Sequence, residues 1–138
     1  MSKPIFVEPN YNKDTGDCCI TCLMMWTGKG YRTVLDAAPP NAHKDGMWNR
    51  EVIETARKLG VTLTAKRKFD LYKDDGILML RPNPKKHPGQ RWLRPHHAVL
   101  LFNGVVLDPY NARVWPDVEL YLLTEGYAPG WLLIEEGQ

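Results

Sequence analysis

The sequence contains few cysteines: its 138 residues include only three, Cys18, Cys19 and Cys22. An odd number of cysteines within five positions cannot staple distant segments, which excludes a disulfide framework. We therefore expect a soluble protein of a reducing compartment, the cytoplasm, whose cysteines react or bind something.

The sequence also lacks a long apolar run and an excess of charge of either sign. No stretch approaches the ~18 apolar residues of a membrane span, and no apolar segment precedes Glu8 as a signal peptide requires. Eighteen Lys and Arg against 16 Asp and Glu give a net charge of +2. We therefore expect neither membrane association nor nucleic-acid binding, and we interpret the basic segment 85–95 as a solvated loop. The oligomeric state stays open.

What the sequence does contain is the composition of an ordinary globular protein, with 43% hydrophobic and 25% charged residues. A chain of this length buries roughly 68% of the surface that it exposes when unfolded, which is enough for one hydrophobic core without disulfide bonds or metal ions. No internal repeat or linker divides the chain. Residues 1–138 are therefore predicted to form a single domain.

Three helices are predicted in the first half of the chain, each an apolar segment that ends at a glycine or a proline. They span residues 18–26, 31–38 and 49–59. The first is apolar nearly all round, which is typical of a central, buried helix. Asn49 is positioned to cap the third helix, and Gly60 is positioned to end it.

Strands are predicted to dominate after residue 60. Apolar or alternating runs indicate strands at residues 61–65, 76–81, 97–102, 105–108 and 130–134. The dipeptide Asn103-Gly104 favours a tight hairpin between two of them. Helices followed by an antiparallel sheet make an α+β fold.

Three residues that carry chemistry stand at positions where folding can bring them together. Cys18 opens the first helix, where free amides and the helix dipole stabilise a thiolate. His97 begins one hairpin strand and can act as the base, while Asp108 ends the next strand and can orient the imidazole. If Phe102 pairs with Val105, His97 and Asp108 are diagonal neighbours on one face of the hairpin.

Three sequence segments carry a family resemblance. Residues 17–25 read Asp-Cys-Cys-Ile-Thr-Cys-Leu-Met-Met, residues 97–101 read His-Ala-Val-Leu-Leu, and Asp108-Pro109 follows. In order and spacing they resemble the acidic-Cys-Gly-x-Ala-Cys-Leu-x-Met signature, the His-Phe-Val-Val-Leu strand and the Asp-Pro pair of the bacteriocin leader peptidases. These are papain-like cysteine peptidase domains of peptide-exporting transporters, and the likeness covers residues 12–114.

The resemblance implies a papain-like cysteine peptidase fold, with N-terminal helices packed on a C-terminal antiparallel sheet, in a bacterial or phage protein. It implies that Cys18 is the nucleophile, His97 the base and Asp108 the orienting group. His96 is not the base by this match, because the family's histidine stands two positions before the first strand valine. The family's oxyanion-hole glutamine lies six positions before the cysteine, a place that Asn12 occupies here.

The implied activity is that of a thiol peptidase or a related amide or isopeptide hydrolase. Its partner is a peptide or protein substrate in a groove between the helices and the sheet, and neither a cofactor nor a metal is expected. The chain departs from the family pattern at Cys19, which replaces a glycine, and at Asn12, which replaces the glutamine. The alternative is a catalytically inactive binding or inhibitor module on the same fold.

Other interpretations of the cysteines stay open. Cys19 also lies in the first helical turn and is a second candidate for the nucleophile, whereas Cys22 is expected to pack in the core. The spacing Cys19-x-x-Cys22 suggests disulfide exchange, but no predicted strand leads into the helix as a thioredoxin-type motif requires. A zinc site with a histidine at 96 or 97 lacks the second ligand pair of structural sites.

Overall fold

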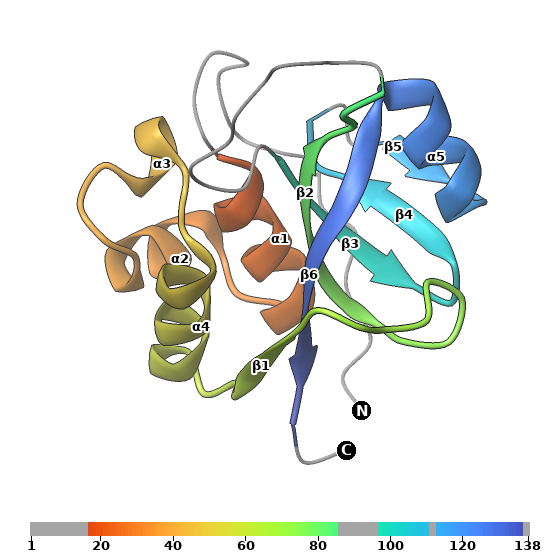
Figure 1. The fold of residues 1–138 in the computed structure, drawn as a ribbon. Helices are drawn as coiled ribbons and strands as arrows, with labels where there is room; N and C mark the ends of the chain where they lie inside the picture. Colours follow the sequence, from red (N-terminus) through yellow and green to blue (C-terminus); the bar gives the residue numbers. More distant parts are fainter. Residues whose placement is uncertain (1–16, 86–96, 111–112, 137–138) are drawn as a thin grey trace.

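A six-stranded antiparallel sheet lies at the centre of the protein, with helices on both of its faces (Figure 1). The computed structural model describes residues 17–85, 97–110 and 113–136. The helices are α1 (Cys18–Thr27), α2 (Tyr31–Ala37), α3 (Ala42–Asp45), α4 (Asn49–Lys58) and α5 (Val118–Glu125). The strands are β1 (Leu63–Lys66), β2 (Gly76–Pro82), β3 (His97–Phe102), β4 (Val105–Asp108), β5 (Arg113–Trp115) and β6 (Tyr127–Glu135), in the sheet order β1-β6-β2-β3-β4-β5. The mixed helix and antiparallel-sheet architecture confirms the predicted α+β class.

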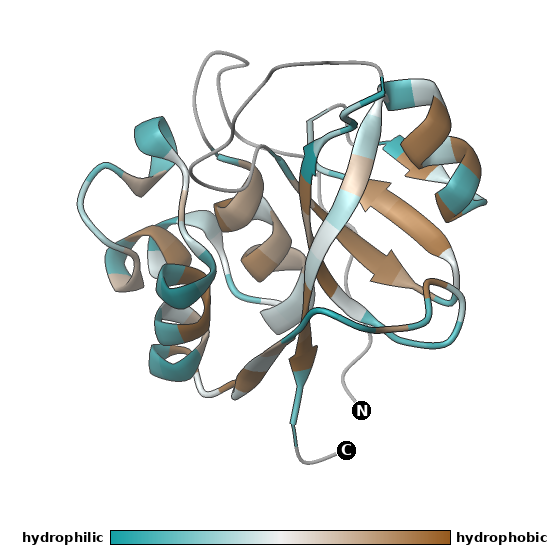
Figure 2. Ribbon diagram, viewed as in Figure 1, coloured by the Kyte–Doolittle hydropathy of each residue, from teal (hydrophilic) through white to brown (hydrophobic). Residues whose placement is uncertain are grey.

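Alternating side chains of the central strands build two hydrophobic cores, one on each face of the sheet. In β2, Ile77 and Met79 join the core that α1, α2 and α4 cover, whereas Leu78 and Leu80 join the core under α5. Figure 2 shows hydrophobic colour along β3 and β4 and hydrophilic colour on much of α4. The sheet is therefore buried between two layers of helix.

Helix α1 is the central helix that the sequence predicts. Every residue from Cys19 to Trp26 is buried, and the helix ends at Gly28, which adopts a left-handed conformation with φ 75°. The Gly28 N–H donates to the Met24 carbonyl at 2.8 Å, which closes the last turn. No helix of the described residues has the length and apolar character needed to cross a membrane.

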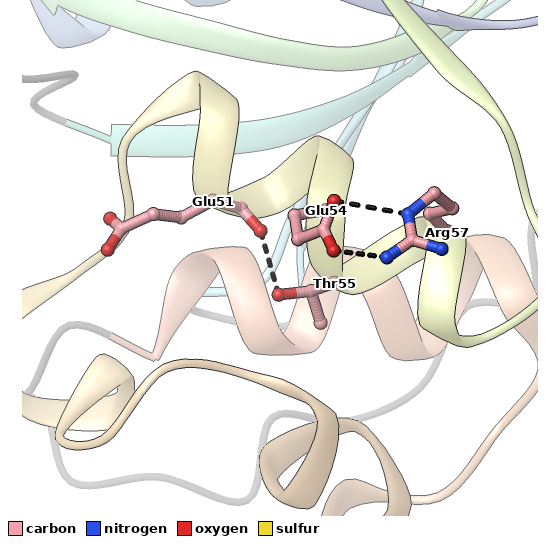
Figure 3. Close-up of polar contacts among 4 residues, drawn as sticks. All are labelled: Glu51, Glu54, Thr55 and Arg57. Atoms are coloured by element: carbon pink, nitrogen blue, oxygen red, sulfur yellow. Dashed lines mark hydrogen bonds and ion pairs between the residues drawn. The ribbon is translucent and has the colours of Figure 1, made fainter.

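Helix α4 starts one residue earlier than the cap prediction required. Asn49 is its first helical residue, and Trp48 occupies the N-cap position. The Glu51 carboxylate accepts the Trp48 N–H at 2.7 Å. Glu51 therefore caps the start of the helix, the role that was predicted for Asn49. Farther along, the Thr55 hydroxyl donates to the Glu51 carbonyl, and Glu54 pairs with Arg57 (Figure 3).

The predicted hairpin forms with the predicted register. Phe102 pairs with Val105 across the turn, and the pairing continues outward to Leu100 and Leu107. Asn103 and Gly104 both adopt positive φ, at 53° and 75°, the geometry that favours this dipeptide in a two-residue turn. This register places His97 and Asp108 on the same face of the sheet.

The prediction that all helices precede the sheet is wrong, because α5 lies between β5 and β6. Strand β6 also begins at Tyr127 instead of residue 130. Pro129 lacks the N–H that a central strand normally donates, which weakens the strand pattern there. The chain accommodates it where the register between β2 and β6 shifts at Met79 and Leu80.

Candidate active site

Cys18 stands at the junction of the helical layer and the sheet. It is the first residue of α1 and is half-buried, whereas Cys19 and Cys22 are buried. Helix α1 packs against β3, and the Ala98 backbone N–H donates to the Cys18 sulfur. The sulfur is therefore held against the beginning of the strand that carries His97.

His97 is the first residue of β3, and its side chain links Cys18 to Asp108. It is 8% exposed, and its Nε2 lies 2.8 Å from Asp108 Oδ1. Cys18 also interacts with His97 and raises its pKa, and Nδ1 is the ring nitrogen that Asp108 does not occupy. Tyr127 stacks on the imidazole with ring centroids 5.6 Å apart, and Tyr110 meets it edge-on at 6.4 Å. The ring is thus fixed by hydrogen bonds and by aromatic packing.

Asp108 ends β4 and is 3% exposed, yet three donors satisfy its carboxylate. Oδ1 accepts from the Tyr110 backbone N–H at 2.9 Å as well as from His97. Oδ2 accepts from the Tyr121 hydroxyl at 2.9 Å. A buried carboxylate with this many donors is stabilised in its charged form.

The electrostatics of the site favour a thiolate beside an imidazolium. The pKa of Cys18 falls well below its ordinary value, chiefly because the Cys19 thiol donates to it; burial opposes this, and the hydrogen bond and charge of His97 add to it. Burial tends to lower the pKa of His97, but its bonds to Asp108 and Cys18 raise it to about 10. Burial also opposes ionisation of Asp108, but His97, Tyr110 and Tyr121 together keep its pKa low.

The other two cysteines have the opposite character. The bond that Cys19 gives to Cys18, together with burial, raises the pKa of the Cys19 thiol well above its ordinary value. Burial likewise raises the pKa of Cys22. Both thiols are buried, whereas Cys18 is half-buried at the start of α1, so the exposure of the three residues favours Cys18 as the nucleophile.

A second buried carboxylate lies on the helical side of Cys18. Asp17 is 2% exposed, and the Tyr31 hydroxyl lies 3.2 and 3.3 Å from its two oxygens. Burial raises the pKa of Asp17, an effect that the Tyr31 bond and the charge of His43 oppose and the Cys18 charge reinforces. The sequence marks Asp17 only as the acidic residue before the nucleophile.

The structure brings together Cys18, His97 and Asp108, as the sequence predicts. Asn12 and His96 lie outside the described residues, so the oxyanion-hole prediction stays a prediction. The sequence analysis missed Tyr121, because it missed α5. Two residues in the sequence signal helix α5. Asp117 precedes it and accepts the Leu120 N–H with its side chain, and Gly126 follows it.

A separate hollow of about 480 Å³ lies along α4, away from these residues in the sequence. It is lined by Ala37, Pro39, Arg50, Glu51, Glu54, Thr55 and Lys58. The Glu51 carboxylate accepts the N–H of the N-cap residue Trp48. Glu54 pairs with Arg57 on the same helix (Figure 3). These carboxylates serve the helix, which leaves the cluster around Cys18 as the stronger candidate site.

Comparison with known proteins adds no assignment. No protein-family model matches the chain, and no curated protein matches it. Within the described residues, no group of three or more His, Cys, Asp or Glu side chains is arranged to hold a metal ion. The function must therefore be argued from the residues around Cys18.

Proposed function

We propose that the protein is a cysteine peptidase or a related amide or isopeptide hydrolase of papain-like fold. One observation carries the proposal: His97 hydrogen-bonds to Asp108 at 2.8 Å and interacts with Cys18 strongly enough to shift the pKa of both groups, although the three residues come from a helix and two strands. A nucleophile, a base within bonding reach and a group that orients the base are the parts that acyl transfer needs.

The first half of the proposed reaction forms an acyl-enzyme. The Cys18 thiolate attacks the carbonyl carbon of the scissile amide, and the carbonyl oxygen becomes an oxyanion. The Cys18 backbone N–H, which has no partner within α1, is one donor for that oxyanion, and Asn12 is the second donor that the sequence suggests. The His97 imidazolium then gives its Nδ1 proton to the leaving amine, and a thioester remains on Cys18.

The second half regenerates the enzyme. Neutral His97 takes a proton from a water molecule, which attacks the thioester and releases the carboxylic acid. The Cys18 thiolate and the His97 imidazolium re-form together. Asp108 keeps its negative charge throughout and holds Nε2 as a donor, so that Nδ1 faces the sulfur at each step.

The arrangement of the elements supports the papain-like part of the proposal. A buried helix carries the nucleophile at its N-terminus. An antiparallel hairpin that packs against this helix carries the base and the carboxylate that orients it. Cys19 occupies the place of the family's glycine without disturbing this arrangement, because it is buried and donates to Cys18. The proposed substrate is a peptide or protein, and the reaction uses no cofactor.

The test measures the reactivity of each cysteine in the intact protein. Iodoacetamide alkylation is followed from pH 4 to pH 10, and mass spectrometry assigns the label to Cys18, Cys19 or Cys22. We expect Cys18 to react with a midpoint well below the ~8.5 of a free thiol, and the other two to stay protected. Cys22→Ala is the matched control, because it removes a buried thiol of the same helix and leaves Cys18 and Cys19 in place.

A mixture of unmodified peptides then tests for hydrolysis, with new termini identified by mass spectrometry. The wild-type protein should cleave a subset of bonds, and Cys18→Ala should cleave none while keeping the wild-type circular dichroism spectrum. A Cys18 midpoint near ~8.5 together with an uncut mixture would overturn the proposal. That pair of results would instead support the inactive binding module.

A further inference from the structure

Tyr121 supplies the hydrogen bond to the oxygen of the Asp108 carboxylate that neither His97 nor the Tyr110 N–H uses. It is fully buried on the inner side of α5, and its hydroxyl donates to Asp108 Oδ2 at 2.9 Å. The other oxygen, Oδ1, already receives His97 Nε2 and the Tyr110 N–H. The two oxygens are therefore held from opposite sides, by β3 and the end of β4 on one and by α5 on the other.

Building on the proposed function, we propose that Tyr121 is a positioning residue that holds the Asp108 carboxylate in the orientation and charge state that keep His97 paired with Cys18. A carboxylate held by a single oxygen can rotate about its last bond, and rotation would take Oδ1 away from His97. With 3% exposure, Asp108 has little access to water that would replace the lost donor. Loss of the hydroxyl would therefore weaken the charged form of Asp108 and, through it, of His97.

The phenol is suited to this role because it stays a donor. Burial, and the negative charge of Asp108 beside it, raise the pKa of Tyr121 far above its ordinary value, so the hydroxyl keeps its proton throughout the range in which the site works. The bond to Oδ2 does not titrate with His97 or Cys18. It therefore acts as a constant restraint on Asp108 during both halves of the reaction.

The ring of Tyr121 is held independently of its hydroxyl. Its centroid lies 5.2 Å from that of Trp115 and 6.1 Å from that of Tyr127, which itself stacks on His97. Removing only the oxygen leaves this aromatic packing intact. Tyr121→Phe thus separates the hydrogen bond from the packing, and is the informative substitution.

The chain offers a control bond at the N-terminus of the same helix, α5. Tyr72 donates to Asp117, the N-cap residue of α5, at 2.8 Å. Tyr72→Phe therefore removes the same kind of bond, from a tyrosine hydroxyl to an aspartate, and disturbs the anchoring of α5 without touching Asp108. An effect that arises from a loosened α5 would be seen in both variants.

The experiment compares the pH profile of Cys18 alkylation by iodoacetamide in the wild-type protein, Tyr121→Phe and Tyr72→Phe. We expect Tyr121→Phe to move the midpoint upward, with alkylation at pH 6 slower by on the order of tenfold. Tyr72→Phe should keep the wild-type profile. In an Asp108→Asn background, Tyr121→Phe should add little, because the carboxylate through which it acts is already gone.

A wild-type profile in Tyr121→Phe would overturn this inference alone, provided that the wild-type midpoint is low. A wild-type midpoint near ~8.5 would instead overturn the proposed function itself. If Tyr121→Phe does not fold, 3,5-difluorotyrosine at position 121 provides the second variant, because it keeps the ring and strengthens the donor. We expect it to lower the Cys18 midpoint; an unchanged or higher midpoint would overturn the inference.

Discussion

Two buried aspartates influence the residues around Cys18, and each is bonded to a tyrosine hydroxyl. Asp17 pairs with Tyr31 of α2, and Asp108 pairs with Tyr121 of α5. They are almost equally buried, at 2% and 3% exposure. Yet the pKa of Asp17 is raised and that of Asp108 is lowered.

The third neighbour of each carboxylate explains the difference. Burial disfavours the charge of both, but Asp108 faces the His97 imidazolium in a 2.8 Å bond and also receives the Tyr110 N–H. Asp17 has the Tyr31 bond and the charge of His43 in favour of its ionised form, and the negative charge of Cys18 against it. A tyrosine bond therefore does not by itself decide whether a buried carboxylate is charged; a cation in contact does.

The strongest test of this comparison removes each carboxylate in turn. Asp108→Asn should lower the turnover of a peptide that the wild type cleaves, because the amide leaves His97 without its anionic partner. Asp17→Asn should change turnover by far less, since Asp17 does not contact His97. Turnover is measured at pH 7 with Cys18→Ala as the blank. Equal losses in the two variants would show that the two aspartates are alike in function.

Stability should respond to the two substitutions with opposite signs. The folded pKa of Asp108 lies below its unfolded value of about 3.9, so its stabilisation is present above that pH and is lost as the pH falls through the folded pKa. Asp108→Asn should then lower the free energy of unfolding at pH 7 by about 3–5 kcal/mol, the cost of breaking a buried pair. The loss should shrink toward pH 3.

For Asp17, the contribution of the ionised carboxylate to stability has the opposite sign. Its folded pKa is raised, so its ionised form lowers stability above the folded pKa, and this penalty disappears below the unfolded value. Asp17→Asn should therefore raise the free energy of unfolding at pH 7, by less than Asp108→Asn lowers it, with no gain near pH 3. Urea unfolding at the two pH values measures both variants. A loss of stability for Asp17→Asn at pH 7 would contradict this account.

The pH profile of hydrolysis offers a finer separation. Activity should rise as Cys18 ionises, well below the ordinary thiol pKa, and should fall tenfold per pH unit above about 10, where His97 loses its proton. Asp17→Asn should leave the upper limb in place, because Asp17 does not bond to His97. A substitution at Asp108 should move the upper limb to lower pH. Parallel shifts of that limb in both variants would contradict the assignment.

The sequence predicts the helix and the hairpin that carry the site better than it predicts the tyrosines that bond to the two aspartates. The hairpin that carries His97 and Asp108 follows from a local signal, the Asn103-Gly104 turn, and its register needs only outward counting. The central helix that begins at Cys18 likewise follows from a short apolar run before Gly28. Both elements depend on neighbours close in the chain, which is why local patterns were sufficient.

The tyrosines could not be found in this way. Tyr31 lies 14 residues from Asp17 and Tyr121 lies 13 from Asp108, and no sequence period links a hydroxyl to a carboxylate over such gaps. Helix α5 also exposes Leu120 and Leu123, which blurs its amphipathic pattern. Packing between elements, and not local preference, places these two residues.

The smallest predicted effect belongs to Tyr31→Phe, and its direction is informative. The Tyr31 hydroxyl is shared between two oxygens at 3.2 and 3.3 Å, so it binds Asp17 more loosely than Tyr121 binds Asp108. Because this bond lowers the pKa of Asp17, losing it makes the neutral acid more abundant and reduces the repulsion of the Cys18 thiolate. We expect a stability loss of about 1 kcal/mol or less. Alkylation of Cys18 by iodoacetamide at pH 6 should become slightly faster, whereas Tyr121→Phe slows it. Slower alkylation in both tyrosine variants would show that the two pairs act on Cys18 in the same way.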